Sequence, residues 1–592
     1  MCNPSAMDPA RKISPTLAPT PRRTWHIAAV VLAWAVATIL WLSVGVTVPD
    51  GVGYYQYLPS TVIDHDLLFF NQWATMGLVR GKRILFKDVT KTDHLADHWT
   101  VGSALFWLPS FLVGDAAWHS IPLLHSFPRD GFRLPHVTAS VTASAIAALV
   151  TLLLGLRLAR DAGASPTASL LAALGTWVGT PLMFYALRGS LMGHVVTSLA
   201  CTGIVVLSLR LRRGIDAETL LAVGLAAGFA CTCRPQVAPF VVVPVLVVGG
   251  RAFLAAGRKV FWYLAGLALG GLPQVVVSFF VYGSPLGFIA TRADGAGSPW
   301  ASVRVVWAPF ERVWTWEPYF SWYHGMFTWT PFLLLGVIGL ILLWRSDPRL
   351  GRAALLCLAV QAVINAVMDR PFWAGHAMGQ RRFDSMVPFF LVGAALVLDR
   401  MPRWLAVVLT SLTCAWTFGL FIAADSPDLD LNAYLPPGRL VSAWASVLSD
   451  PSAWLRPLAF VPAAGRGRVF VVLVLTALAW VIGAVLVWRA RPAVRTGLAA
   501  AYLASCAVLL AWCGTHDRAR TAPWRELIAR DRRLGEAAGY AASRSAFLHQ
   551  EAGWLQQTGR EGEAARVRAE AEKFDRALAA RLREAGLPPD GE

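Results

Sequence analysis

The first candidate for chemistry is Asp50, which stands in the stretch VTVPDGVGYYQYLP directly after a long apolar run. A carboxylate at such a place can accept a proton from the hydroxyl group of a substrate. Tyr54 and Tyr55 follow closely, and the aromatic residues predict a helix that lies in the membrane interface. Aspartate is also a common N-cap residue, so the local sequence leaves a functional and a capping interpretation open.

A second set of polar side chains lies further along the same predicted loop, in DHDLLFFNQW and DHLADHWTVGSALFWLPSF. Aspartate and histidine in such numbers could hold a divalent metal ion, but exposed polar loop residues would give the same pattern. Both interpretations stay open, and we assign no metal to Asp64, His65, Asp66, Asp93, His94, Asp97 and His98. The stretch WTVGSALFWLPSF predicts a short interfacial helix that ends at Pro109.

Isolated basic residues stand at the ends of later apolar runs, on the side of the membrane where we place Asp50. They are Arg188 and His194 in YALRGSLMGH, Arg234 in CTCRPQ, and Arg381 and Arg382 in GHAMGQRRFDS. Ionisable residues at the edge of a span are costly and therefore indicate function. Arginine suits phosphate, because its planar guanidinium can bind two oxygens at once. The alternative is that these side chains simply reach out to the interface.

A third candidate segment, WTWEPYFSWYHGMFTWTP, is dense in aromatic residues. Within it, Tyr323 and His324 could contact a sugar ring, which stacks well on aromatic faces. Aromatic residues also gather at membrane interfaces as anchors, so this alternative stays open for every single residue of the segment.

The composition shows what must position these residues. Of the 592 residues, 56% are hydrophobic and only 15% are charged, well below the roughly 25% of soluble domains. The net charge of +17 comes largely from arginine clusters in short loops between apolar runs, which is the pattern of cytoplasmic loops. We therefore predict a membrane protein and no nucleic-acid partner.

A membrane span needs about 20 apolar residues. The chain offers about 13 candidate runs, near 25–47, 136–158, 166–187, 194–211, 217–232, 236–250, 260–282, 329–344, 353–368, 386–399, 403–423, 469–488 and 497–513. The predicted fold is an all-α polytopic membrane protein with interfacial helices in its external loops and a helical C-terminal tail. With this count the arginine clusters all fall on one side of the membrane, which places the N-terminus in the cytoplasm.

The runs divide the chain into three parts. Residues 1–22 predict a disordered cytoplasmic tail and residues 23–513 a transmembrane domain, whose first external loop is 48–135. Residues 514–592 are rich in Ala, Glu, Arg and Leu and predict an external helical tail. Seven of the eight cysteines lie in or beside apolar runs, so a disulfide framework is not expected.

Several motifs, taken in their order along the chain, resemble one family. The apolar run ending at Asp50, GVGYYQYLPS, DHDLLF, WTVGSALFWLPSF, CTCRP, WYHGMFTWTP and GHAMGQRRFDS are similar to the integral-membrane glycosyltransferases of the GT-C superfamily. The likeness covers residues 25–513 and is greatest to bacterial relatives of protein mannosyltransferases and of the lipid A aminoarabinose transferase. It implies a GT-C-like fold, a polyprenyl-phosphate-linked sugar donor, no cofactor, and an acid of the first external loop as general base.

Asp50 matches the position of that acid. The family commonly has a second acid beside it, but here Gly51 follows, so Asp64, Asp66 or Asp97 could share its role. Direct attack by an acceptor hydroxyl on the donor sugar would invert the anomeric carbon. The expected function is sugar transfer to a glycan, lipid or protein at the external face of a bacterial inner membrane. The alternatives are a transporter or flippase of a lipid-linked glycan, and a non-catalytic assembly protein that acts through its tail.

Overall fold

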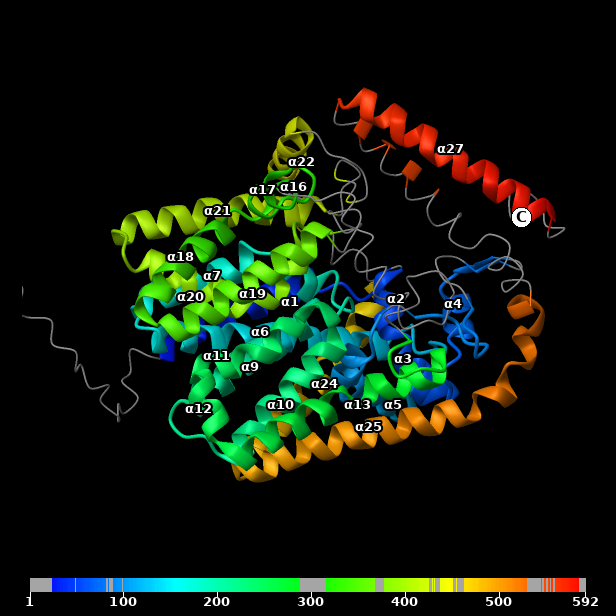
Figure 1. The fold of residues 1–592 in the computed structure, drawn as a ribbon, viewed down its shortest axis with the longest axis horizontal. Coiled ribbons are helices and arrows are strands. Elements are labelled where there is room, and N and C mark those ends of the chain that lie inside the picture. Colours follow the sequence, from blue (N-terminus) through cyan, green and yellow to red (C-terminus); the bar gives the residue numbers. More distant parts are fainter. Residues whose placement is uncertain are drawn as a thin grey trace, which may run out of the picture.

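A computed structural model describes most of the chain between residues 24 and 584. The described residues are 24–47, 49–80, 83–84, 89–97, 99–287, 316–367, 377–424, 429, 431, 437–450, 454, 463–529, 545, 548–549, 552–553, 555–556 and 559–584. Figure 1 shows a bundle whose helices run mostly along its long axis, with α12 (Gly250–Ala255) towards one end and α4 (Phe70–Thr75) towards the other. The predicted N-terminal tail, 1–22, and His98 lie outside the described residues.

Each of the predicted apolar runs contains helix. The bundle consists of α1 (Thr24–Trp41), α6 (His136–Asp161), α7 (Pro166–Val178), α8 (Leu182–Leu187), α9 (His194–Leu211), α10 (Ala217–Cys233), η4 (Pro235–Val242), α11 (Val243–Val248), α13 (Val260–Tyr282), α18 (Phe332–Ser346), α19 (Pro348–Val367), α20 (Val387–Leu398), α21 (Arg403–Ala423), α24 (Ala463–Arg489) and α25 (Pro492–Arg520). Among the described residues, seven helices are long and apolar enough to cross a membrane, and five shorter apolar helices accompany them. The fold-class prediction of an all-α polytopic membrane protein is confirmed.

The remaining elements are the longer helices α5 and α27 and a set of short elements that lie mostly in the connections. They are α2 (Asp50–Tyr55), α3 (Tyr57–Pro59), η2 (Ser60–Asp64), α4, β1 (Val79–Arg80), β2 (Arg83–Ile84), α5 (Gly102–Ser120), η3 (Pro122–Leu124), α12, η5 (Gly257–Lys259), α16 (Glu317–Phe320), α17 (Met326–Trp329), η7 (Arg381–Met386), α22 (Pro437–Ser449), η9 (Ala522–Trp524) and α27 (Glu561–Glu584). The strands β1 and β2 form one antiparallel pair, in which Val79 lies opposite Ile84.

The outer surface of the bundle is apolar, as a lipid-facing surface must be. Only 11% of the most apolar stretch of α24 is buried, although its mean hydropathy is 2.8. Its exposed side chains include Phe470, Ile482 and Leu486. In water such a surface would be strongly unfavourable, whereas in lipid it costs nothing.

The predicted cytoplasmic ends of the helices meet at one end of the bundle. Beyond α9, the Arg212 guanidinium lies 2.5 Å from the Asp347 carboxylate between α18 and α19. Arg349 donates to the carbonyl of Val248 at the end of α11, and Lys259 donates to the carbonyl of Ile215. These contacts bring the loops that follow α9, α11 and α18 together, as a common side for these loops requires.

Helix α5 corrects one prediction. It runs from Gly102 to Ser120 and therefore continues through Pro109, which was expected to end it. Proline removes the hydrogen bond to the carbonyl four residues earlier. That carbonyl, on Leu105, instead accepts a hydrogen bond from the Tyr502 hydroxyl of α25 at 2.5 Å. A hydroxyl from a distant helix thus satisfies the carbonyl that Pro109 leaves without a partner, and the helix continues.

Helices α10 and α13 pack through a glycine face on each helix. Gly224 and Gly228 on α10 face Gly266 and Gly270 on α13, so both helices carry the small-xxx-small spacing of close membrane packing. A Cβ added at Gly228 would stand 2.3 Å from the carbonyl oxygen of Leu267. This close approach matters for the site, because α10 ends directly before Arg234.

We expect Gly228→Ala to lower the thermal unfolding midpoint of the detergent-purified protein. Two backbones would have to separate, and overpacking of this kind costs about 1–3 kcal/mol. Gly271→Ala is the matched control, because a Cβ there meets nothing within 4 Å. Equal midpoints for the two variants would contradict the packing role of this glycine face.

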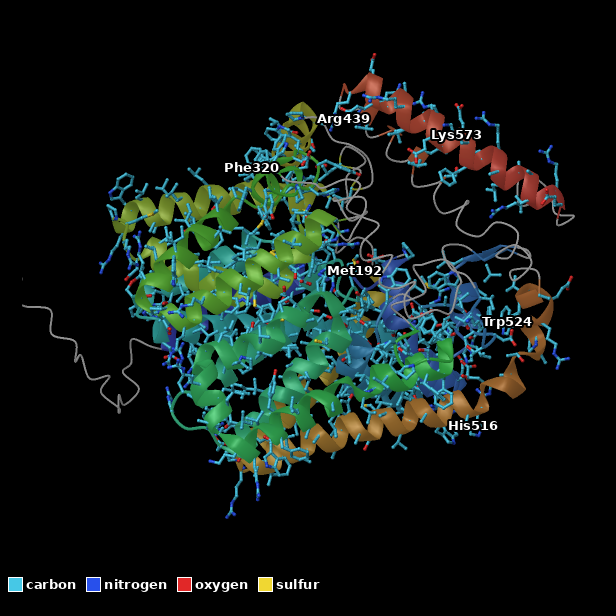
Figure 2. All side chains as sticks on the ribbon, viewed as in Figure 1. Met192, Phe320, Arg439, His516, Trp524 and Lys573 are labelled. Atoms are coloured by element: carbon cyan, nitrogen blue, oxygen red, sulfur yellow. The ribbon has the colours of Figure 1, made fainter. Side chains whose placement is uncertain are left out.

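The C-terminal part differs from the prediction at its boundary. Helix α25 continues without a break to Arg520, so the expected tail boundary at residue 513 falls inside it. Figure 2 shows Lys573 on α27, a helix that lies apart from the bundle, and Met192 within the bundle. The tail is held together internally, since His549 lies 2.7 Å from Asp575 of α27.

Candidate active site

The centre of the candidate site is an ion pair between Asp50 and Arg381. The Arg381 guanidinium Nη2 lies 2.7 Å from the Asp50 Oδ2, and both side chains are largely buried. Asp50 is the first residue of α2, whose N-cap is Pro49, and no side chain caps this helix. The structure therefore does not support the capping interpretation of Asp50. Arg381 begins η7, directly before α20, so two segments far apart in the sequence supply the pair.

A second pair lies beside the first. Asp384, one turn of η7 after Arg381, accepts from Arg234 at 3.1 Å and lies 2.8 Å from the His194 Nδ1. Arg234 follows the end of α10, and His194 begins α9. Gly193 directly precedes it with a φ of +75°, a conformation that suits glycine and that aims the first turn of α9 at η7.

Two tyrosines border this cluster. The Tyr185 ring of α8 packs on the His194 imidazole with centroids 4.1 Å apart, and its hydroxyl accepts from the backbone N–H of Met378 at 3.0 Å. Tyr54 of α2 is buried, and burial raises the pKa of its hydroxyl. Both phenols stay protonated at neutral pH and can donate hydrogen bonds to a ligand.

The charges decide the protonation of Asp50. Burial works to raise the pKa of the Asp50 carboxyl, but the positive charge of Arg381 and smaller effects of His194 and Arg234 outweigh it, and the pKa is lowered. Asp50 is therefore ionised at neutral pH. With two arginines and two aspartates, the cluster balances its own charge before any ligand binds.

A cavity opens beside the cluster. One part of its wall is polar and includes His194, Arg381 and Asp384. Other lining residues are apolar and include Leu333 and Phe390. Such a cavity suits a ligand that has both a charged and an apolar portion.

Asp64 and Asp66 lie in a different network. Asp66 accepts from the Ser60 hydroxyl at 2.8 Å and lies 3.9 Å from Arg520, while Asp64 accepts from the Gln72 amide. Burial and the neighbouring Asp66 carboxylate raise the pKa of Asp64 to about 6. The structure thus separates these two carboxylates from the partners of Asp50.

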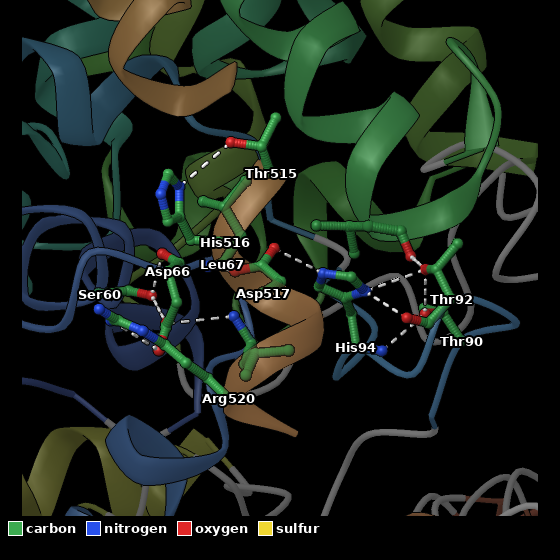
Figure 3. A network of polar contacts seen from close by, with 12 residues as sticks. Ser60, Asp66, Leu67, Thr90, Thr92, His94, Thr515, His516, Asp517 and Arg520 are labelled. Carbon is green, nitrogen blue, oxygen red and sulfur yellow. Dashed lines mark hydrogen bonds and ion pairs between the residues drawn. The ribbon is translucent and has the colours of Figure 1, made fainter. Parts of the chain in front are cut away.

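This network joins the first external loop to the end of α25 (Figure 3). His94 Nε2 lies 2.8 Å from Asp517, which also accepts from the backbone N–H of Leu67 at 2.9 Å. His94, Asp66 and Asp97 are buried, so the interpretation of these loop residues as exposed polar side chains is wrong for them. Among the described residues, no group of three or more His, Cys, Asp or Glu side chains could hold a metal ion.

Four other predicted residues lie away from the Asp50 pair. Arg188 donates to the carbonyl of Phe421 and covers the ring of that residue at 4.2 Å. The Tyr55 hydroxyl donates to the carbonyl of Gly131 at 2.7 Å. His324 lies 2.9 Å from the carbonyl of Leu431, with the Tyr323 ring beside it.

Two residues of the cluster were not predicted. Asp384 stands in the same motif as Arg381, three residues later. This spacing could have identified it, because residues three apart share a face of a 3₁₀ helix. Tyr185 stands in the motif that supplied Arg188 and His194, but nothing in the sequence distinguishes it from other interfacial aromatic residues.

The comparisons with known proteins give distant matches only. No protein-family model matches the chain, and no curated protein matches it. Among solved structures, ArnT from Cupriavidus metallidurans bound to undecaprenyl phosphate is similar, at 12% identity and a TM-score of 0.39, over 88% of this chain and 80% of that one. The apo state of the same ArnT has 14% identity and a TM-score of 0.36, with the same coverage. A likeness this weak says nothing of function, which is inferred from the site itself.

Proposed function

We propose that this protein is a membrane glycosyltransferase that moves a sugar from a polyprenyl-phosphate carrier to an acceptor hydroxyl at the external face of a bacterial inner membrane. The observation that supports this most directly is the Asp50–Arg381 pair, at 2.7 Å, next to a cavity whose lining includes both charged and apolar side chains. A carboxylate can take the acceptor proton, and guanidinium groups can stabilise a phosphate leaving group.

The roles follow from the chemistry of the transfer. The acceptor oxygen attacks the anomeric carbon, its proton passes to Asp50, and the bond from that carbon to the phosphate oxygen breaks. The electron pair stays on the phosphate, which gains one negative charge, and the attack inverts the anomeric carbon. In this proposal Arg381 and Arg234 bind the phosphate, and Tyr54, Tyr185 and His194 contact the sugar or the phosphate.

The ion pair also offers a way to activate Asp50. In the absence of donor, Arg381 holds the carboxylate in its ionised form and makes it a weak base. A phosphate that takes over the Arg381 guanidinium removes this stabilisation, so the pKa of Asp50 rises towards that of a buried carboxyl. Donor binding would thereby make Asp50 a stronger base at the moment when one is needed.

The purified protein should release undecaprenyl phosphate from at least one undecaprenyl-phosphoryl sugar when an acceptor is present. Donors that carry mannose, glucose, galactose and arabinose form a suitable panel, with membrane extracts as the source of acceptor and release followed by mass spectrometry. Failure to bind undecaprenyl phosphate or any of these donors would overturn the proposal. Donor movement across a vesicle membrane without release would instead favour a flippase.

A further inference from the structure

Helix α2, which carries Asp50, is too short to hold its own position. It has six residues and no side-chain cap, and a helix becomes stable by itself in water only at a length of roughly 12 residues. Contacts with other segments must therefore fix Asp50. At the N-terminal end of α2 this contact is the ion pair with Arg381. Because the proposed mechanism hands this guanidinium to the donor phosphate, α2 needs another anchor while the sugar is transferred.

Such an anchor lies at the other end of α2. The side-chain amide of Gln56, the C-cap residue, donates to a carboxyl oxygen of Asp97 at 2.5 Å. Gln56 is fully buried and Asp97 is 1% exposed, so water does not compete for this bond. A Cβ added at Gly53, in the middle of α2, would stand 2.1 Å from a carbon of the Trp99 ring. Asp97 and Trp99 thus hold α2 at its end and at its middle.

Asp97 is itself fixed by α13. The hydroxyl of Tyr282 accepts from the backbone N–H of Asp97 at 2.8 Å and donates to the backbone carbonyl of the same residue. About two turns earlier on α13, the side chain of Gln274 accepts from the backbone N–H of Val101 at 2.9 Å. Since α13 packs closely on α10 through the glycine faces, these contacts tie the loop around Asp97 to a pair of closely packed helices.

The same part of the loop also touches the end of α10, after which Arg234 follows. The buried Thr100 hydroxyl donates to the carbonyl of Cys233 at 2.8 Å. A Cβ added at Gly102 would stand 2.5 Å from the backbone nitrogen of Cys233. The part of the loop that begins at Asp97 therefore sets the position of α2 relative to Arg234.

We infer that Asp97 is a positioning residue that keeps Asp50 in place after the donor phosphate has taken over Arg381, an inference that rests on the proposed function. Asp97 acts through Gln56 and touches neither donor nor acceptor. A displacement of about 1 Å at the reacting groups costs up to about 10²-fold in rate, and such groups keep their place only when the residues around them are locked. Loss of Asp97 should therefore slow transfer but leave donor binding intact, because Arg381 and Arg234 belong to other segments.

The test measures kcat with saturating undecaprenyl-phosphoryl sugar, the one of the panel that the wild type uses, and the dissociation constant of the same lipid. For Asp97→Ala we expect kcat to fall roughly 10- to 100-fold and the dissociation constant to change by less than about twofold. Gln56→Leu removes the same bond from the α2 side and should have a similar effect. In the double variant the two losses should not multiply, because both substitutions remove one contact.

Asp97→Asn distinguishes positioning from a share in base catalysis. Its amide oxygen can still accept from Gln56 but cannot take the acceptor proton, so kcat should stay within about threefold of the wild-type value. A loss in Asp97→Asn as large as the loss in Asp97→Ala would overturn the positioning role.

Ser110→Ala on α5 is the matched control. The buried Ser110 hydroxyl accepts from the indole N–H of Trp480 at 2.8 Å, a contact between α5 and α24, which carry no residue of the cluster. We expect this variant to lose thermal stability and to keep its kcat per donor-binding site. The same result for Asp97→Ala, or a rise in its dissociation constant that matches the fall in kcat, would overturn the inference alone. A wild-type protein that releases undecaprenyl phosphate from no donor would overturn the proposed function and this inference with it.

Discussion

Asp50→Asn should reduce sugar transfer by roughly 10³-fold, the scale of a lost general base. The amide cannot take the acceptor proton, although it fills nearly the same volume as the carboxylate. Binding of the donor lipid should persist, because Arg381 remains and no longer has an anionic competitor beside it. The measurement is kcat with saturating undecaprenyl-phosphoryl sugar, together with the dissociation constant of the same lipid.

Asp64→Asn serves as the matched control for this variant. Asp64 is another aspartate of the first external loop, but its partners are Gln72, Asp66 and Arg520. We expect the Asp64→Asn variant to keep most of the wild-type kcat. The raised pKa of the Asp64 carboxyl favours its neutral form, which a neutral amide resembles. Full activity in Asp50→Asn, or an equal loss in both variants, would exclude Asp50 as the base.

Arg381→Ala should raise the dissociation constant of undecaprenyl phosphate by roughly 10- to 100-fold, which corresponds to the loss of one charge-assisted phosphate contact. It should also lower kcat. Without Arg381, burial dominates the environment of Asp50, so the pKa of its carboxyl rises and a larger fraction is protonated at neutral pH. The acidic limb of the pH–rate profile should therefore move to higher pH.

Arg381→Lys separates the effect on lipid affinity from the effect on the pKa of Asp50. Lysine keeps the positive charge near Asp50 but loses the planar fork that binds two phosphate oxygens. We expect the pH profile to stay near that of the wild type while lipid affinity still falls. An unchanged lipid affinity in both Arg381 variants and in Arg234→Ala would remove the basis for the phosphate assignment.

In the predicted first external loop, candidate residues chosen from the sequence have different surroundings in the structure. From the sequence, Asp50 was the first candidate for the base, and Asp64, Asp66 or Asp97 could share its role. In the structure Asp50 faces Arg381, whereas Asp66 faces Ser60 and Arg520. The difference depends on where α25 and η7 lie relative to the loop, and no local pattern encodes that position.

The sequence by itself predicted that the chain is a bundle of apolar helices and where those helices lie along it. Apolar content and arginine placement are properties of each segment alone, because a span must satisfy its own backbone hydrogen bonds in lipid and its charged ends must remain in water. It also singled out Asp50, Arg234 and Arg381 as costly charges at the ends of spans.

Only the tertiary structure decided which of these charges meet. The pairing of Asp50 with Arg381 and of Arg234 with Asp384 joins three separate segments, and the close glycine packing of α10 on α13 sets the position of one of them. The periodicity of a helix tells which face is buried but not what lies against it. The partner of a buried charge depends on how distant helices pack, and that is a property of the assembled bundle.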